Sequence, residues 1–215
     1  MDWLEANHQQ ENTVILFMSD NGGLSSGGHW RSGEPHTHNA PLNSGKGSAY
    51  EGGIREPMIV SWPGKVEAGS RCDQYVIIED FYPSILDMAQ IRKYKTVQVV
   101  DGISFVPLLA QSGDPSEGRK LYWNCPNLWG NTGPGIGVTC SVRDGDWKLV
   151  YYYDSGEKEL FNIREDIGEK RNLASDHPGL VKRLSKELGK YLRKVGGQRP
   201  SFKITGKPCP WPDEV

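Results

Sequence analysis

The sequence contains no long apolar run, and no stretch approaches the roughly 18 apolar residues that a membrane-spanning helix needs. It also has little excess of charge of either sign, with a net charge of -2 and an isoelectric point near 6.2. That balance gives no reason to expect a nucleic acid partner. No internal repeat is visible. Residues 1–5 lack the basic and apolar regions of a signal peptide, so none is expected at this start.

Cysteine is scarce and is not clustered. The four cysteines are Cys72, Cys125, Cys140 and Cys209, and no two of them have the C-x-x-C spacing of common zinc sites. A zinc site is therefore not expected. One or two disulfides and four free thiols are all compatible with this pattern, so the cysteines do not indicate a cellular compartment.

The length of the chain and its aromatic residues indicate a folded protein. Its 215 residues can bury a sizeable core, as one large domain or two small ones. Seven tryptophans and nine tyrosines argue against disorder. A polar linker at 111–119 marks the expected boundary between an α/β domain over 1–110 and an α+β domain over 120–215.

Residues 14–18 form an unbroken apolar run, which predicts a strand buried on both faces of a mostly parallel sheet. Directly after Ser19 come a carboxylate and a carboxamide, Asp20 and Asn21, and then two glycines. Ligands of open α/β sheets bind just outside the carboxyl ends of the strands. We therefore expect Asp20 and Asn21 to lie where chemistry takes place.

The remainder of the first domain is predicted to contain a loop, a strand and a helix. Residues 24–49 are rich in glycine, histidine and proline without apolar periodicity, and loops of that length are usually functional or disordered. Residues 58–62 form a second short apolar strand, and residues 79–89 have the apolar stripe of a helix.

Strand signals dominate the second domain and predict a small antiparallel four-stranded sheet packed on a C-terminal helix. Half-buried sheet packing explains the aromatic run at 147–153 better than a sugar-stacking platform does. The helix is expected at 178–195, and a solvated surface is favoured for its basic face. The four strands are expected at 121–124, 137–143, 147–153 and 158–162.

Asp20 and Asn21 offer hard oxygen ligands, which suit Ca²⁺ or Mg²⁺ better than zinc or copper. A turn or a helix cap would explain the Asp-Asn-Gly-Gly sequence equally well, and the position at a strand end favours the metal. Ca²⁺ takes about six to eight oxygen ligands, so most of them must come from elsewhere.

Lys46 stands between two glycines, which let the backbone approach a ligand closely while the lysine supplies a point charge for an oxyanion. The upstream glycine spacing and the following helix of a phosphate-binding P-loop are missing. Taken alone, Lys46 is more simply explained as a surface lysine. Arg55 is expected to pair with Glu51 or Glu56 rather than to bind an anion.

Four residues of the long loop are candidate substrate contacts: His29, Arg31, His36 and His38. His36 and His38 have the spacing of metal ligands on a strand, but exposed polar histidines explain this loop better, and imidazole suits softer metals. The hypothesis rests on the loop bordering a pocket. Alanine substitutions at these positions that left the substrate preference of an active parent enzyme unchanged would contradict it.

Several segments together point to one family. TVILFMSDNGG (13–23), GKGSAYEGGIR (45–55), PMIVSWPG (57–64) and DFYPSIL (80–86) resemble the sulfatases, formylglycine-dependent hydrolases of the alkaline-phosphatase superfamily. Segments 159–163 and 169–173 look like the C-terminal subdomain of that family. The resemblance covers nearly the whole chain but only the C-terminal part of a sulfatase. It implies an alkaline-phosphatase-like fold and an arylsulfatase-like sulfuric ester hydrolase.

By this resemblance, Asp20 and Asn21 would be two ligands of the active-site Ca²⁺ of the complete enzyme. Lys46 would hold the sulfate group of a sulfate ester, with sulfated glycans among the expected substrates. In the family, a cysteine in a Cys-x-Pro-x-Arg or Cys-x-Ala-x-Arg motif becomes formylglycine, whose hydrate attacks sulfur. The metal and the lysine neutralise the charge that develops on the sulfate oxygens.

The nucleophile of the family has no counterpart in this sequence. No cysteine here fits the motif, and no serine fits its Ser-x-Pro-x-Arg variant. The N-terminal aspartate pair, the arginine and the acid/base histidine of the family are also missing. We therefore expect a C-terminal fragment of a sulfatase that is inactive alone and binds Ca²⁺ weakly.

Two other functions stay open. One is a non-catalytic module that binds a glycan or a protein partner. The sheet edge that missing strands would expose favours pairing with another chain, including a second copy of itself. The other is a phosphoester hydrolase of the same superfamily, although the Lys46 segment favours sulfate. The sequence does not give the substrate or the compartment. Sulfatases are often periplasmic, secreted or lysosomal.

Overall fold

The computed structural model describes residues 1–24, 39–128 and 133–215, which form two compact units. The first unit comprises residues 1–18 and 58–117, and the second comprises residues 19–57 and 118–215. The domain boundary inferred from the sequence stays a prediction.

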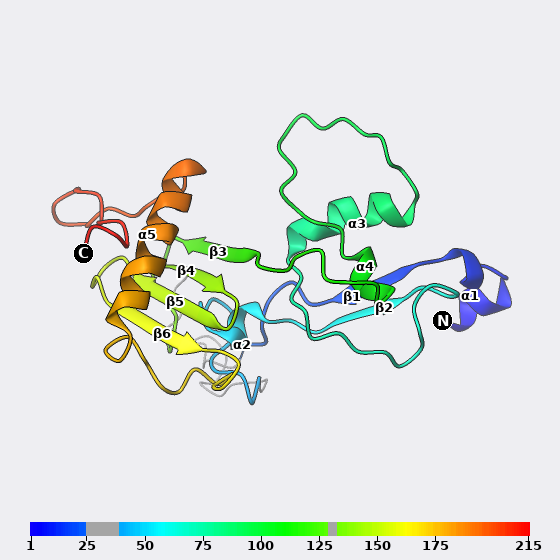
Figure 1. Cartoon of the computed structure of the whole chain (residues 1–215), viewed down its shortest axis with the longest axis horizontal. Helices are drawn as coiled ribbons and strands as arrows, with labels where there is room; N and C mark the ends of the chain where they lie inside the picture. Colours follow the sequence, from blue (N-terminus) through cyan, green and yellow to red (C-terminus); the bar gives the residue numbers. More distant parts are fainter. Residues whose placement is uncertain (25–38, 129–132) are drawn as a thin grey trace. The chain divides into compact units, whose positions relative to one another are not determined.

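The first unit combines short helices with a pair of strands (Figure 1). Strand β1 (Ile15–Met18) pairs antiparallel with β2 (Met58–Ser61), with Ile15 opposite Ser61. Both strands were predicted from their apolar runs, and both are confirmed. The other elements are α1 (Asp2–Ala6), the 3₁₀ turns η1 (Gln10–Asn12) and η2 (Ile78–Asp80), α3 (Phe81–Met88) and α4 (Val106–Leu109).

The predicted burial of the first strand on both faces is wrong for this chain. Phe17 of β1 and Ile59 of β2 are 65% and 63% exposed. Within the described residues, β2 is the only strand that pairs with β1, and the pairing is antiparallel. An apolar side chain on such a two-stranded ribbon therefore remains open to solvent on one face.

The predicted helix at 79–89 is confirmed as η2 followed by α3. Buried Ser84 in α3 donates to the carbonyl of Asp80 at 2.6 Å and accepts a hydrogen bond from the backbone N–H of Phe105 at 2.9 Å. These bonds hold the segment before α4 against α3. Sequence reasoning did not identify α4, because four residues are too few to show helical periodicity.

The second unit contains an antiparallel sheet in the order β3-β4-β5-β6, a long helix α5 and a single turn of helix α2 (Glu51–Ile54). The four strands and the C-terminal helix are confirmed close to their predicted positions. Their bounds are β3 (Lys120–Cys125), β4 (Thr139–Asp144), β5 (Trp147–Tyr152), β6 (Lys158–Asn162) and α5 (Pro178–Lys194).

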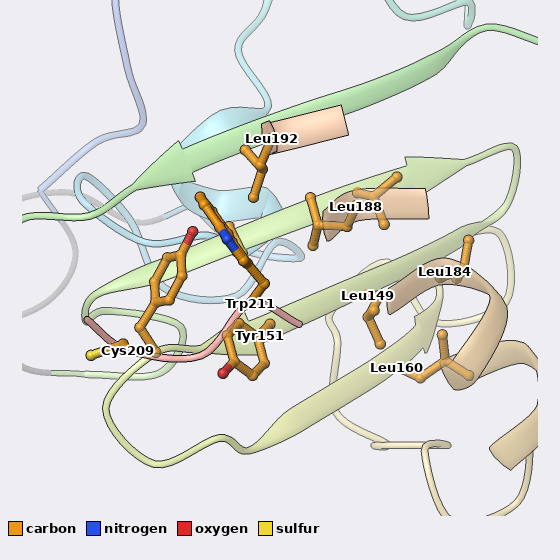
Figure 2. Close-up of a cluster of buried hydrophobic side chains, with 11 residues drawn as sticks. Leu149, Tyr151, Leu160, Leu184, Leu188, Leu192, Cys209 and Trp211 are labelled. Carbon is orange, nitrogen blue, oxygen red and sulfur yellow. The ribbon is translucent and has the colours of Figure 1, made fainter. Parts of the chain in front are cut away.

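One face of this sheet is covered by α5 (Figure 2). Apolar residues that recur at helical spacing in α5 face alternate residues of the strands, and together they form the largest buried cluster. The cluster includes Leu184, Leu188 and Leu192 of α5, Leu149 and Tyr151 of β5, Leu160 of β6, and Cys209 and Trp211 from the end of the chain.

The opposite face of the sheet is also covered, which the sequence did not predict. Ala49 and Tyr50 pack there against Val150 and Phe161, and the rings of Tyr50 and Phe161 meet edge to face at 5.3 Å. The strand expected at 147–153 was predicted to be half-buried, and this underestimates its burial. Residues 148–151 are all buried, so side chains on both faces of the strand are covered. The missing apolar/polar alternation in that run follows from this double coverage.

The sequence left open whether the four cysteines form disulfides or remain free thiols. In the structure all four are free thiols. Cys72 and Cys125 are exposed, and Cys140 and Cys209 are buried. Among the residues described, no helix has both the length and the apolar character needed to cross a membrane.

Candidate functional site

The structure joins the two segments that sequence reasoning had singled out separately. The backbone N–H of Lys46 donates to the carbonyl of Gly23 at 3.1 Å, and the backbone N–H of Gly22 donates to the carbonyl of Gly53 at 3.2 Å. The Asp-Asn-Gly-Gly segment therefore lies directly beside the glycine-flanked lysine segment. No local pattern in the sequence indicated this contact.

Asn39 holds the two segments together. Its Nδ2 atom lies within hydrogen-bonding distance of three carbonyl oxygens, at 3.0 Å from Gly23, 2.9 Å from Ser44 and 3.2 Å from Gly52. One amide group thus satisfies acceptors from both sides of the site, and buried backbone acceptors need such partners.

The glycines of this region are required by close backbone approach. A Cβ atom on Gly22 would lie 1.8 Å from the carbonyl oxygen of Gly52, and one on Gly52 would lie 2.2 Å from the carbonyl oxygen of Asn43. A Cβ atom on Gly53 would lie 2.3 Å from the carbonyl oxygen of Ser48. Real side chains do not tolerate such distances, so only glycine fits.

Asp20 is exposed and Asn21 is partly buried. The Nδ2 atom of Asn21 donates to the carbonyl of Gly22 at 3.3 Å. Burial together with the negative charge of Asp20 raises the pKa of Glu56. Two acidic groups therefore share this region, and their mutual repulsion would be relieved by a cation. Within the described part of the chain, however, no three histidine, cysteine, aspartate or glutamate side chains are grouped as a metal site.

A buried ion network lies next to this region. The Nζ atom of Lys148 in β5 is 3.1 Å from Oε1 of Glu51 and 2.8 Å from Oε1 of Glu169. The backbone N–H of Glu51 donates to Oε2 of Glu169 at 2.6 Å. Arg143 and Arg55 approach Oε2 of Glu51 at 3.4 Å and 3.5 Å. The network therefore ties α2 to the four-stranded sheet.

The charges in this network set the protonation of its two carboxylates. Burial alone would raise the pKa of Glu51, but the positive charges of Lys148 and Arg143 outweigh it and lower that pKa. Burial raises the pKa of Glu169, and Lys148 offsets only part of this rise. Glu51 is therefore the carboxylate that the network holds most firmly in its charged form.

The network confirms one sequence prediction and adds residues that sequence reasoning missed. Arg55 pairs with Glu51, as expected. Lys148 and Glu169 were not identified as partners of Glu51. The available signal was Lys148 itself, a charged residue within the otherwise apolar and aromatic run of β5. The candidate contacts His29, Arg31, His36 and His38 lie outside the described residues.

The fold and the site together define a class of protein. An α/β unit, an antiparallel four-stranded sheet under a C-terminal helix, and an Asp-Asn pair beside a glycine-flanked lysine are the features expected of the C-terminal part of a sulfatase. The family model described as N-sulphoglucosamine sulphohydrolase, C-terminal, matches residues 45–196. The chain belongs to this family.

Individual relatives agree with this assignment. A sulfatase of Formosa agariphila is 31% identical over 195 residues, which cover 86% of this chain and 34% of that protein. The human N-acetylgalactosamine-6-sulfatase is 29% identical over 240 residues, which cover 98% of this chain and 43% of that protein. The chain thus spans less than half the length of either relative.

Solved structures confirm the predicted fold class. The crystal structure of Ps i-CgsB in complex with k-i-k-neocarrahexaose is similar with a TM-score of 0.74 and 31% identity, over 94% of this chain and 40% of that one. A phosphonate monoester hydrolase from Silicibacter pomeroyi has a TM-score of 0.64 at 21% identity, and this similarity shows a shared fold alone.

Proposed function

We propose that this chain supplies part of a sulfate ester hydrolase site. In it, Lys46 binds the sulfate group, and Asp20 and Asn21 are two oxygen ligands of a Ca²⁺ ion. The observation that carries the proposal is the hydrogen bond between the Lys46 N–H and the Gly23 carbonyl, because it holds the Asp-Asn segment beside the lysine. Sulfate is favoured over phosphate because the named relatives are sulfatases.

Lys46 has the chemistry that the proposed role needs. Its ammonium group is a compact positive charge that would neutralise the charge developing on the sulfate oxygens as the ester bond breaks. The glycines on either side of it leave room for an anion to approach the backbone. Its backbone N–H donates to the Gly23 carbonyl, which fixes the point on the backbone from which the side chain extends.

The oxygen atoms of Asp20 and Asn21 fit a hard cation such as Ca²⁺. The ion, when bound, supplies Lewis-acid polarisation of a sulfate oxygen. Two ligands fall well short of the six to eight or so that Ca²⁺ takes, so this chain should bind the ion weakly.

Calorimetric titration with Ca²⁺ tests this part of the proposal. We expect heats that correspond to an affinity weaker than micromolar and that disappear in the variant D20A/N21A. The variant D2A/N7A, which changes an exposed Asp and Asn elsewhere, is the matched control and should bind like the unmodified chain. Micromolar or tighter binding at Asp20 and Asn21 would contradict the proposal.

The chain is proposed to be inactive by itself, because none of its cysteines fits the nucleophile motif. Purified chain should release no p-nitrocatechol from p-nitrocatechol sulfate. Turnover that persists after removal of contaminating enzymes, and that is abolished in K46A, would show that a nucleophile is present after all.

Sulfated glycans are the substrate class that we propose for the complete enzyme. One relative is named for a sulfated amino sugar, and the Ps i-CgsB structure holds a carrageenan-type oligosaccharide. His29, Arg31, His36 and His38 remain predicted contacts for such a substrate. Self-association through a sheet edge also remains a prediction, which size-exclusion chromatography at several concentrations would check.

A further inference from the structure

Residues 48–51 connect the Lys46 segment to the sheet of the second unit. All four are buried, with exposed fractions of 5%, 6%, 6% and 1%. Together they contact the segment at 134–135 and the two strands β5 and β6. Ser48 Oγ donates to the Pro134 carbonyl at 2.8 Å, and the Ala49 N–H donates to the Gly135 carbonyl at 2.9 Å. Tyr50 Oη donates to Glu159 Oε2 in β6 at 2.8 Å. Glu51 forms an ion pair with Lys148 in β5 at 3.1 Å.

Lys148 occupies the centre of this attachment. Its side chain is fully buried between two carboxylates that are themselves no more than 2% exposed. Glu169 accepts the backbone N–H of Glu51, while Lys148 binds the side chain of Glu51 and that of Glu169. Glu51 is thus held at its backbone and at its side chain by two residues that also hold each other.

Such a network permits little variation in the position of Glu51. A displacement that broke one of these ion pairs would leave a buried charge without its partner, which is strongly unfavourable. Glu51 is five positions after Lys46 in the sequence. A fixed Glu51, together with the bond from Lys46 to Gly23, therefore restricts the short segment between them at both ends.

We propose that Lys148 is a positioning residue of the sulfate site: by fixing Glu51, it holds the segment that carries Lys46 in one place on the four-stranded sheet. This inference rests on the proposed function, because it takes Lys46 as the sulfate-binding group. It gives the C-terminal sheet a role in the site. Ordering a loop before the ligand arrives removes that entropic cost from binding.

A purely structural role for Lys148 makes a different prediction. In that case its removal would lower the free energy of unfolding but would leave the Lys46 segment ordered in molecules that remain folded. The positioning role predicts local loosening of that segment in the folded protein. Hydrogen exchange of the Lys46 amide reports this difference, because local opening exposes that amide without global unfolding.

The experiment compares four variants with the unmodified chain at a temperature where each is fully folded by circular dichroism. K148M removes the buried positive charge. E51Q/K148M/E169Q, the triple variant, neutralises Lys148 and both carboxylates at once while Arg143 and Arg55 remain, and it serves as the test if K148M does not fold. V142A is the matched control, because Val142 is fully buried on the neighbouring strand, against α5, outside the network. K46A removes the proposed sulfate ligand.

We expect the Lys46 amide to exchange at least about tenfold faster in K148M and in the triple variant than in V142A. We also expect weaker binding of inorganic sulfate in both variants, followed by amide shifts. Exchange no faster than in V142A would overturn the inference. So would unchanged sulfate affinity in a protein whose K46A variant has lost sulfate binding. If K46A binds sulfate normally, the proposed function fails, and the exchange rates still decide whether Lys148 holds the segment.

Discussion

Lys148 and Glu51 form an ion pair across 97 positions of the sequence, with 3.1 Å between Nζ and Oε1 and no more than 2% of either side chain exposed. An ion pair so deeply buried stabilises little compared with a well-packed apolar pair, because both charges must be taken out of water. Removal of one partner is a different matter, because the remaining charge stays buried without compensation.

This difference predicts how substitutions in the network act. K148M should lower the free energy of unfolding by about 3–5 kcal/mol, because it takes the Lys148 cation away from buried Glu169 and leaves Glu51 with only the longer contacts to Arg143 and Arg55. The triple variant E51Q/K148M/E169Q should regain part of that loss, because both buried carboxylates are neutralised together with the lysine, while Arg143 loses its contact with Glu51. Urea denaturation of both variants checks the prediction. A triple variant less stable than K148M would show that the charges themselves stabilise the fold.

The hydrogen-bond donor of Asn39 leads to a second prediction. N39D keeps the shape of the side chain but places a carboxylate against the carbonyl oxygens of Gly23, Ser44 and Gly52. We expect it to lower the free energy of unfolding by about 3 kcal/mol, because the three carbonyl oxygens lose the Asn39 donor and face a negative charge, and only Gly23 keeps a second donor, the Lys46 N–H.

Asn7 supplies the control for this substitution. It is exposed, and its Nδ2 atom donates to one carbonyl, that of Trp3, at 2.8 Å. N7D should therefore cost less than about 1 kcal/mol. Urea denaturation measures the free energy of unfolding of both variants. An equal decrease in N39D and N7D would mean that the three contacts of Asn39 stabilise the fold no more than the single contact of Asn7.

The end of the chain gives a prediction about pH. Arg193 in α5 donates two hydrogen bonds to Asp213, one of them at 3.0 Å, and this lowers the pKa of Asp213 below its usual value of 3.8. A carboxylate with a lowered pKa stabilises the folded state above its unfolded pKa, and that contribution disappears as the pH falls through the folded pKa.

D213N should therefore be less stable than the unmodified chain at neutral pH, by about 1 kcal/mol or less because the pair is partly exposed. The difference should shrink to nothing between about pH 5 and pH 2, as the unmodified chain itself becomes protonated. Urea denaturation at several pH values measures this directly. A difference that stays constant down to the lowest pH would exclude the ion pair as its cause.

The cysteines should react in two classes. Burial raises the pKa of the Cys140 thiol to about 12, and Cys209 is also buried with a raised pKa. Since the thiolate is the reactive form, both should remain unmodified in the folded protein. Titration with Ellman's reagent should show two rapid equivalents, from Cys72 and Cys125, and two more only after unfolding. A rapid third equivalent would contradict the burial of Cys140 and Cys209.

Much of the fold could be predicted from the sequence because its elements have local causes. The apolar run before Asp20 predicts a strand, and the spacing of Leu184, Leu188 and Leu192 predicts a helix with one buried face. The coverage of β5 on its second face could not be predicted, because it depends on a segment about a hundred positions earlier in the chain.

The candidate site was predictable only in its separate parts. Asp20 and Lys46 could each be singled out by chemistry and by flanking glycines. Their proximity results from backbone bonds of Gly22, Gly23 and Gly53, which no side-chain pattern encodes. The pairing of Lys148 with Glu51 was missed because the two residues lie 97 positions apart in the sequence. A lone lysine in an apolar strand was nevertheless a visible sign of a buried partner.

The central claim is that Lys46 binds the sulfate group beside the Asp-Asn segment, and a titration of the ¹⁵N-labelled chain with inorganic sulfate tests it most directly. The account predicts amide shifts concentrated at residues 45–48 and 20–23 that are lost in K46A. They should be retained in K65A, which changes an exposed lysine that also follows a glycine. Shifts that persist unchanged in K46A, or that occur only elsewhere in the chain, would contradict the account.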